Sequence, residues 1–126
     1  MRYALALEYD GSEFLGWQKN LTGATVQAEV EKALSFVANQ VIHVVCSGRT
    51  DARVSAQCQI IHFDSDSPRD LRAWLLGMNS RLPQSVRGLW IQAVSDDFHA
   101  RYSARARRYR YSLIVRPVQP AINRQF

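Results

Sequence analysis

The chain has 126 residues, of which 47% are hydrophobic and 21% charged, and its formal net charge is +5. These values predict one globular domain large enough to bury a core, and they argue against a disordered chain. The apolar runs are short and broken by charges, and the first residues lack a secretory pattern, so neither a membrane protein nor an exported one is indicated. We therefore expect a cytoplasmic protein.

Alternation and helical spacing predict the elements of the first part of the chain. Residues 2–9 alternate between large apolar and small or polar side chains, which is the period of a strand. "DGSEFLGW" at 10–17 indicates a turn or loop, and a helix is expected after it. Thr25 can cap that helix and Asn39 can end it. Its apolar face is formed by Val26, Val30, Ala33, Leu34 and Val37.

Strands and a second helix are predicted for the remainder. The β-branched runs 40–46 and 57–63 indicate two strands on either side of a loop. The second helix is expected to start with Ser67 as its cap, Pro68 in the first helical position and Asp70 near its positive end. Its buried stripe would consist of Leu71, Trp74, Leu75 and Met78. Residues 87–94 and 107–115 indicate two further strands.

This order of elements predicts an α+β fold. The sequence β-α-β-β-α-β-β is typical of a ferredoxin-like, RRM-like sandwich, in which two helices cover one face of an antiparallel sheet. The other face would stay open, and an open face with Tyr and Arg is a common platform for single-stranded or splayed RNA. A fold of this kind does not by itself define a function.

The positive charge lies at the C-terminal end. Residues 98–126 contain seven arginines and no Asp or Glu, whereas residues 1–97 contain nine basic and eleven acidic residues. Tyr102, Tyr109 and Tyr111 lie among these arginines. Guanidinium groups beside aromatic rings suit a polyanion that carries bases better than a membrane surface, although a solvated basic strand would have the same composition. The pattern favours nucleic acid as the partner.

The cysteine and histidine positions favour free thiols and match no metal site. Cys46 and Cys58 fall on neighbouring predicted strands, so a disulfide between them is one alternative, but two free, buried thiols are favoured in a reducing compartment. The three histidines have spacings that match no metal signature, so we expect neither a metal nor a cofactor.

The loop "SGRTDARVSAQ" at 47–57 carries the residues with the most chemical potential. Asp51 lies close to Arg49 and Arg53, and positive neighbours favour the ionised form of a carboxylate. A positioned, ionised aspartate can act as a nucleophile or a base. The same residue could also cap a turn or pair with an arginine, and spacing alone favours that structural interpretation.

Five blocks of the sequence change this balance. They are "YDGSEFLGWQ" (9–18), "TVQAEVEKAL" (25–34), "GRTDARVSAQCQIIHF" (48–63), "LP" (82–83) and "DDFHARYSARARRYRYSLI" (96–114). In this order they resemble the amino-terminal half of the tRNA pseudouridine synthase A family, over nearly the whole chain. The resemblance implies isomerisation of uridine to pseudouridine in the anticodon stem-loop of tRNA, at tRNA positions 38–40. It also implies a homodimer and a reaction without a cofactor.

The resemblance implies roles for individual residues. The target base must leave the stack before a carboxylate can reach it, and Asp51 would then attack the ribose or the uracil ring, or abstract a ribose proton. Arg49 would take the place of the flipped base in the stem. Tyr109 would stack on the target base, although it could equally be an ordinary aromatic residue of a sheet face. The candidates for phosphate contacts are Arg101, Arg105, Arg107, Arg108 and Arg110.

Other nearby residues are expected to be structural. His99 should have a local structural partner, while Trp17 and Trp74 should pack in the interior.

The loop departs from the family pattern at two key positions. The family usually continues "GRTDAGVH", so Arg53 replaces a glycine and Ser55 replaces a histidine. If that glycine serves a positive backbone angle or a close approach to RNA, Arg53 strains or crowds the loop.

The length of the chain is the larger departure. Family members carry a second, similar domain, and their catalytic cleft lies between the halves. We therefore expect residues 1–116 to form the amino-terminal catalytic domain, residues 117–126 to begin a linker, and the site to be incomplete in this chain alone. The alternatives are a non-catalytic RNA-binding module with an RRM-like sheet, whose usual aromatic signature is missing here, and a structural interaction domain.

Overall fold

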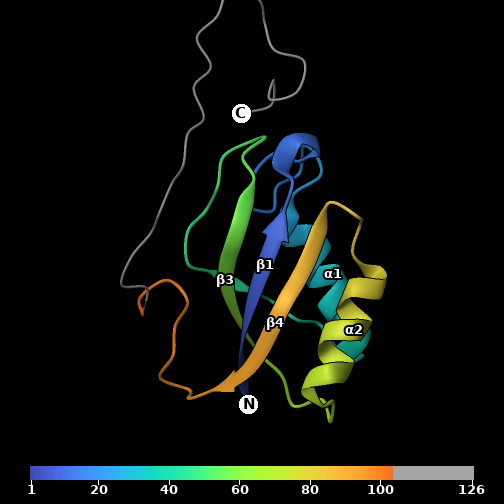
Figure 1. Ribbon diagram of the computed structural model, residues 1–126, viewed down its shortest axis with the longest axis vertical. Helices are drawn as coiled ribbons and strands as arrows, with labels where there is room; N and C mark the ends of the chain where they lie inside the picture. Colours follow the sequence, from blue (N-terminus) through green and yellow to red (C-terminus); the bar gives the residue numbers. More distant parts are fainter. Residues whose placement is uncertain (104–126) are drawn as a thin grey trace, which may run out of the picture.

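An antiparallel sheet forms one layer of the computed structural model, which describes residues 1–103 (Figure 1). Its strands are β1 (Arg2–Tyr9), β2 (Val45–Cys46), β3 (Ala56–Asp64) and β4 (Val86–Val94). Their spatial order is β2-β3-β1-β4, so the first strand of the chain is central and pairs with both β3 and β4. This order confirms the α+β, ferredoxin-like fold. The predicted strand at 107–115 and the expected domain boundary at 116 lie outside the described residues.

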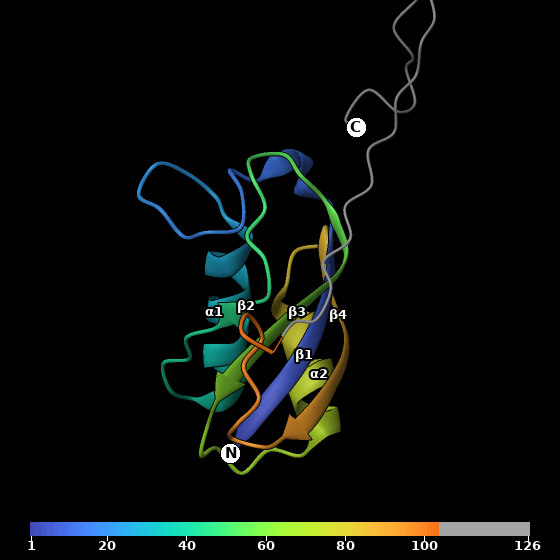
Figure 2. The same cartoon turned by 90° about the vertical axis from the view of Figure 1, so that its left-hand side faces the viewer.

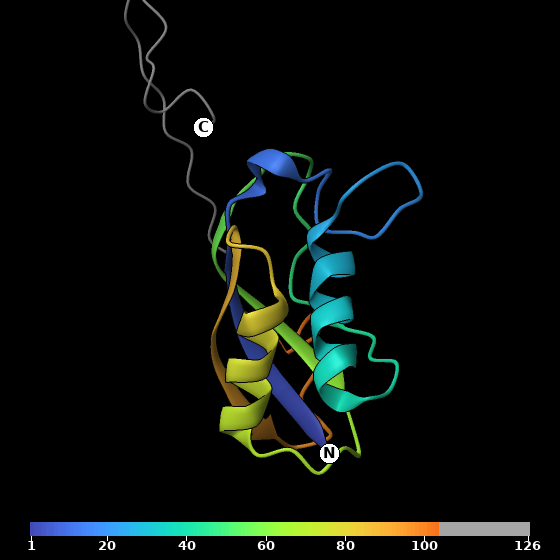
Figure 3. The ribbon, with the colours of Figure 1, turned by 90° about the vertical axis from the view of Figure 1, so that its right-hand side faces the viewer.

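Two helices, α1 (Val26–Ala38) and α2 (Leu71–Arg81), form the second layer on one face of the sheet (Figure 3). Alternate residues of β1 point toward them, and Leu5 and Leu7 are completely buried. Trp74 of α2 packs on the rings of Tyr3 and Phe63, with ring centroids 5.7 and 5.0 Å away. No helix among residues 1–103 is long and apolar enough to span a membrane.

The ends of α1 confirm the prediction. The Thr25 hydroxyl accepts a hydrogen bond from the Ala28 N–H at 3.3 Å, which satisfies a donor of the first turn. Asn39 ends the helix in the left-handed conformation with φ 55°, which asparagine tolerates better than most residues.

The predicted start of α2 is wrong by three residues. The structure places Asp70 at the N-cap, where its carboxylate accepts from the Ala73 N–H at 2.7 Å. The Ser67 hydroxyl instead donates to the Ala38 carbonyl at the end of α1, at 2.5 Å, and Arg69 donates to the Val37 carbonyl. These long-range bonds hold residues before Asp70 outside the helix. Leu71, expected in the buried stripe, is 42% exposed because it lies in the first turn.

The predicted strand at 40–46 is also shorter in the structure, where only Val45–Cys46 pairs with β3. The preceding backbone donors bond to side chains of α1: the Ile42 N–H donates to the Ser35 hydroxyl at 2.9 Å, and the Val44 N–H donates to the buried Glu31 carboxylate at 3.0 Å. Because side chains of α1 already accept from these backbone N–H groups, the segment does not have to pair with a neighbouring strand to satisfy them.

Both cysteines are free, as expected, but only one is buried. Cys46 lies in the core, whereas Cys58 is exposed. Cys58 follows Gln57 and precedes the buried Gln59, so alternation along β3 turns the thiol away from the helices. The expectation of two buried thiols was therefore wrong for Cys58.

We expect Asp70→Ala to lower the free energy of unfolding by about 1 kcal/mol, because the Ala73 N–H loses its capping partner. Urea unfolding followed by circular dichroism measures this. Asp66→Ala is the matched control, since this exposed carboxylate makes no side-chain hydrogen bond within residues 1–103. Equal stability of Asp70→Ala and wild type would contradict the assignment of the cap.

Candidate functional site

The Asp51 loop, residues 47–55, connects β2 to β3 at the end of the sheet away from the N-terminus (Figure 1). Asp51, Arg49 and Arg53 are all exposed. Within residues 1–103 the Asp51 carboxylate forms no ion pair with either arginine and no hydrogen bond. The structural interpretation, in which Asp51 pairs with a neighbouring arginine, therefore has no support among the described residues.

The turn segment, residues 10–17, holds this loop by backbone hydrogen bonds. It includes the 3₁₀ turn η1 (Gly11–Glu13). The Trp17 N–H donates to the Thr50 carbonyl at 3.0 Å, and the Arg53 N–H donates to the Phe14 carbonyl at 3.0 Å. These two bonds flank Asp51 on both sides, so an exposed loop is fixed at the residues around its carboxylate.

Two glycines allow this close approach. A Cβ on Gly11 would collide with the Val54 carbonyl, and one on Gly16 would lie 2.9 Å from the Thr50 carbonyl. Gly16 also has φ +90°, which residues with a side chain rarely adopt. Sequence reasoning described "DGSEFLGW" only as a turn or loop, and its two glycines were the available signal for a backbone contact.

The departures from the family pattern have clear structural positions. Arg53 has φ 68°, so this position does require a positive backbone angle. Ser55 accepts a hydrogen bond from the Gly11 N–H through its hydroxyl, at 2.9 Å. The Asp10 carboxylate accepts from the Ser12 N–H at 3.0 Å, and this bond, followed by the Ser12 hydroxyl, holds the pKa of Asp10 below its ordinary value. Ser55 thus joins the loop to the turn segment.

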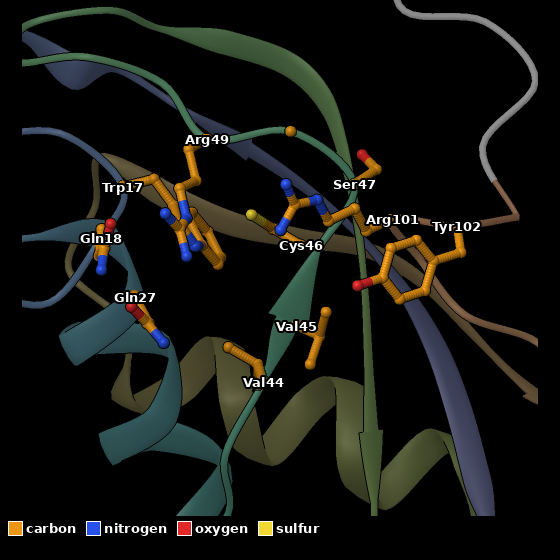
Figure 4. A pocket seen from close by; sticks show the side chains of 11 residues that line it. Trp17, Gln18, Gln27, Val44, Val45, Cys46, Ser47, Arg49, Arg101 and Tyr102 are labelled. Carbon is orange, nitrogen blue, oxygen red and sulfur yellow. The ribbon is translucent and has the colours of Figure 1, made fainter.

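A cavity of about 620 Å³ lies beside the loop, and Asp51 is not among the residues that line it (Figure 4). Arg49 and Arg101 extend into it toward Cys46, with Trp17 and Tyr102 on its walls. Burial raises the pKa of the Cys46 thiol, although both guanidinium charges act in the opposite direction. The structure therefore brings the predicted residues Arg49 and Arg101 together and leaves Asp51 outside this cavity.

Residues 98–103 return to the edge of the sheet beside β2 (Figure 2). The Ala100 N–H donates to Nδ1 of His62, which is 4% exposed, at 2.9 Å. His99 accepts from the N–H groups of Arg101 and Tyr102, and its ring stacks on Tyr102 with centroids 4.3 Å apart. This confirms a local structural partner for His99. Trp17 and Trp74 are buried, as predicted.

Several predicted site residues lie outside the described residues. They are Tyr109, Arg105, Arg107, Arg108 and Arg110. Their roles stay predictions. In the described part of the chain, no three His, Cys, Asp or Glu side chains gather as they would to hold a metal ion.

The antiparallel sheet with helices on one face defines an α+β domain. Its candidate catalytic residue is an exposed aspartate on a loop that backbone hydrogen bonds hold in place. The family model described as tRNA pseudouridine synthase matches residues 5–103. The chain belongs to this family.

The curated relatives carry the name tRNA pseudouridine synthase A. The protein from Stenotrophomonas maltophilia (strain K279a) is 61% identical over 127 residues, which cover 99% of this chain and 49% of the relative. The Xylella fastidiosa (strain M23) protein is 58% identical, with 100% and 49% covered. The protein of Xanthomonas axonopodis pv. citri (strain 306) is 56% identical. The chain spans about half the length of the curated relatives it matches.

We expect Arg53→Gly to raise the free energy of unfolding by about 0.5–1 kcal/mol. Glycine removes the cost of a left-handed side-chain-bearing residue, and its greater freedom in the unfolded chain offsets part of the gain. Urea unfolding measures the change. Lys32→Gly, which puts a glycine at an exposed interior position of α1, should instead lower stability by about 1 kcal/mol. A loss of stability in Arg53→Gly would contradict the strain at this position.

We expect stability to fall as the pH drops from about 6.5 to about 4. Burial, followed by the Arg2 charge, lowers the pKa of His62 from 6.5 to about 4. Over this interval the unfolded chain binds a proton that the folded chain excludes, so the contribution is complete above the unfolded pKa and is lost toward the folded one. The loss is on the order of 2 kcal/mol. Urea midpoints at several pH values should show it.

His62→Gln is the control for this pH dependence, because an amide can accept from the Ala100 N–H and does not titrate. The slope between pH 6.5 and 4 should largely disappear in this variant. An unchanged slope would assign the effect to other groups.

Proposed function

We propose that the chain is the Asp51-bearing, amino-terminal half of a tRNA pseudouridine synthase. Its reaction is the isomerisation of uridine to pseudouridine in the anticodon stem-loop, at tRNA positions 38–40. The observation that carries this proposal is the exposed Asp51 carboxylate, which has no bonding partner within residues 1–103, on a loop fixed on both sides of it. Such a carboxylate is available to a substrate and needs little reorganisation.

The chemistry asks little beyond a positioned carboxylate. The bond from the ribose to N1 of uracil breaks, the ribose bonds to C5, and the C5 proton is released while N1 gains one. The reaction is a balanced isomerisation that needs no oxidant, reductant or cofactor. The base must leave the helical stack for Asp51 to reach it, and Arg49, exposed in the same loop, is the residue that fills the vacated place.

Binding of the tRNA backbone is assigned to the basic residues. Arg101 lines the cavity beside the Asp51 loop, and its guanidinium group suits phosphate oxygens. Tyr109 would stack on the target base, and Arg105 and Arg107 would add phosphate contacts. These last three assignments rest on the family resemblance.

The second half of the relatives' length would complete the site. In this proposal residues 1–116 form one domain, residues 117–126 begin the linker, and the intact protein is a cytoplasmic homodimer. The 49% coverage of the relatives supports a partner domain of similar size.

Asp51→Asn should abolish turnover and leave tRNA binding within about twofold, because the amide keeps the shape of the side chain and loses its nucleophilic charge. Release of tritium from C5-labelled uridine in tRNA measures turnover, and filter binding measures affinity. Both assays use the native polypeptide, whose full length is first established by measuring its mass. Asp66→Asn, another exposed aspartate, is the control and should behave as wild type.

The outcomes separate the candidate functions. Turnover in Asp51→Asn rules out the nucleophile assignment. Salt-sensitive tRNA binding by a wild type that shows no turnover points instead to a non-catalytic RNA-binding module.

A further inference from the structure

We propose that Gln59 is a positioning residue for Asp51, whose buried carboxamide fixes the start of the Asp51 loop. The inference rests on the proposed function for its catalytic meaning. Its structural content, that one side chain anchors Ser47, Gly48 and Tyr9, can be tested separately.

Gln59 lies on β3 opposite Leu7 and is 6% exposed. Its Oε1 accepts from the Ser47 hydroxyl at 2.8 Å and from the Gly48 N–H at 3.3 Å. Its Nε2 donates to the Gly48 carbonyl and, at 3.4 Å, to the Tyr9 hydroxyl. A carboxamide offers two donors and two lone pairs, so all of its capacity is used here.

These bonds begin where the sheet ends. Directly after β2, the Ser47 N–H still donates to the Ile60 carbonyl of β3, at 2.8 Å. Gly48 then leaves the ladder, and the Gln59 side chain binds both its N–H and its carbonyl as a strand neighbour would. The Gln59 side chain therefore holds the backbone of Gly48, one residue beyond the last one that the sheet holds by a backbone hydrogen bond.

Tyr9 connects Gln59 to Thr50, the residue before Asp51. The Tyr9 hydroxyl, 3.4 Å from Nε2 of Gln59, is also 2.8 Å from the Thr50 hydroxyl. The Thr50 carbonyl is held in turn by the Trp17 N–H at 3.0 Å. Gly48 and Thr50 are thus both tied to the core, and Asp51 follows directly.

The burial of an amide at this place needs a reason. A buried polar group destabilises the fold unless its hydrogen bonds are complete, whereas a methionine of similar length would fill the volume without that risk. The observed partners of Gln59 lie at the loop and at Tyr9, which contacts the loop. A role in loop geometry accounts for the amide where simple core packing does not.

The test compares Gln59→Met and Gln59→Glu with wild type in the tritium-release assay. Displacement of a catalytic group by about 1 Å can cost about 100-fold in rate. We expect Gln59→Met to lower kcat by about 10- to 100-fold with KM within about threefold. Gln57→Met, at an exposed position two residues earlier on β3, is the matched control and should leave both constants unchanged.

Gln59→Glu provides a readout that packing alone would not move. An ionised carboxylate keeps the acceptor for Ser47 and Gly48 but cannot donate to the Gly48 carbonyl, and a protonated one can. Its kcat relative to wild type should therefore rise as the pH falls. A pH-independent ratio contradicts the proposal.

Amide hydrogen exchange distinguishes failure of this inference from failure of the proposed function. In Gln59→Met, the amides of Gly48, Trp17 and Arg53, whose N–H groups donate the hydrogen bonds at the loop, should exchange at least about tenfold faster while β1 and β4 keep their protection. This arm decides the inference even if wild type shows no turnover, a result that would refute the proposed function alone. Unchanged exchange in the loop, a uniform loss of protection in all strands, or wild-type kcat in Gln59→Met would each overturn the positioning role.

Discussion

The candidate site depends on the contact between two backbone segments at one end of the sheet. Residues 11–17 and 50–55 approach so closely that no side chain fits between them at Gly11 or Gly16. The contact satisfies the Thr50 carbonyl before Asp51 and the Arg53 N–H after it, which would otherwise point into water from a long connection. An exposed carboxylate is thereby held by groups that are themselves largely buried, and this is the condition under which a loop can serve catalysis.

The two faces of the sheet have different contacts. The helix-covered face contains the core residues that make the fold stable, including Leu5, Leu7 and Trp74. The other face receives residues 98–103 through the bond from Ala100 to His62. This bond requires a neutral imidazole, since a protonated ring has no acceptor. Arg101 and Tyr102 follow Ala100 directly in the sequence, so a core histidine fixes the backbone just before them.

The sequence pattern correctly predicted those strand and helix ends that depend on neighbouring residues in the chain. The ends of β1 and α1 follow from alternation and from the caps Thr25 and Asn39. The start of α2 and the length of β2 depended on bonds to α1, and no local pattern reveals that Ser67 would bond to Ala38. The motif and its family resemblance predicted the candidate aspartate. They did not predict the residues that hold its loop in place. Gln59 and Gly11 act through residues far away in the sequence, so only the fold could show their partners.

The unequal burial of the two cysteines gives the protein a built-in attachment point. Among the chain's two thiols, Cys46 is shielded and resists ionisation, while Cys58 is open to solvent one residue from Gln59. A maleimide dye or a nitroxide would therefore couple at a single place without mutagenesis. Since Cys58 points away from the helices, the attached group would sit on the uncovered face of the sheet. A nucleic acid that reached this face would change the emission or the rotational freedom of the attached group.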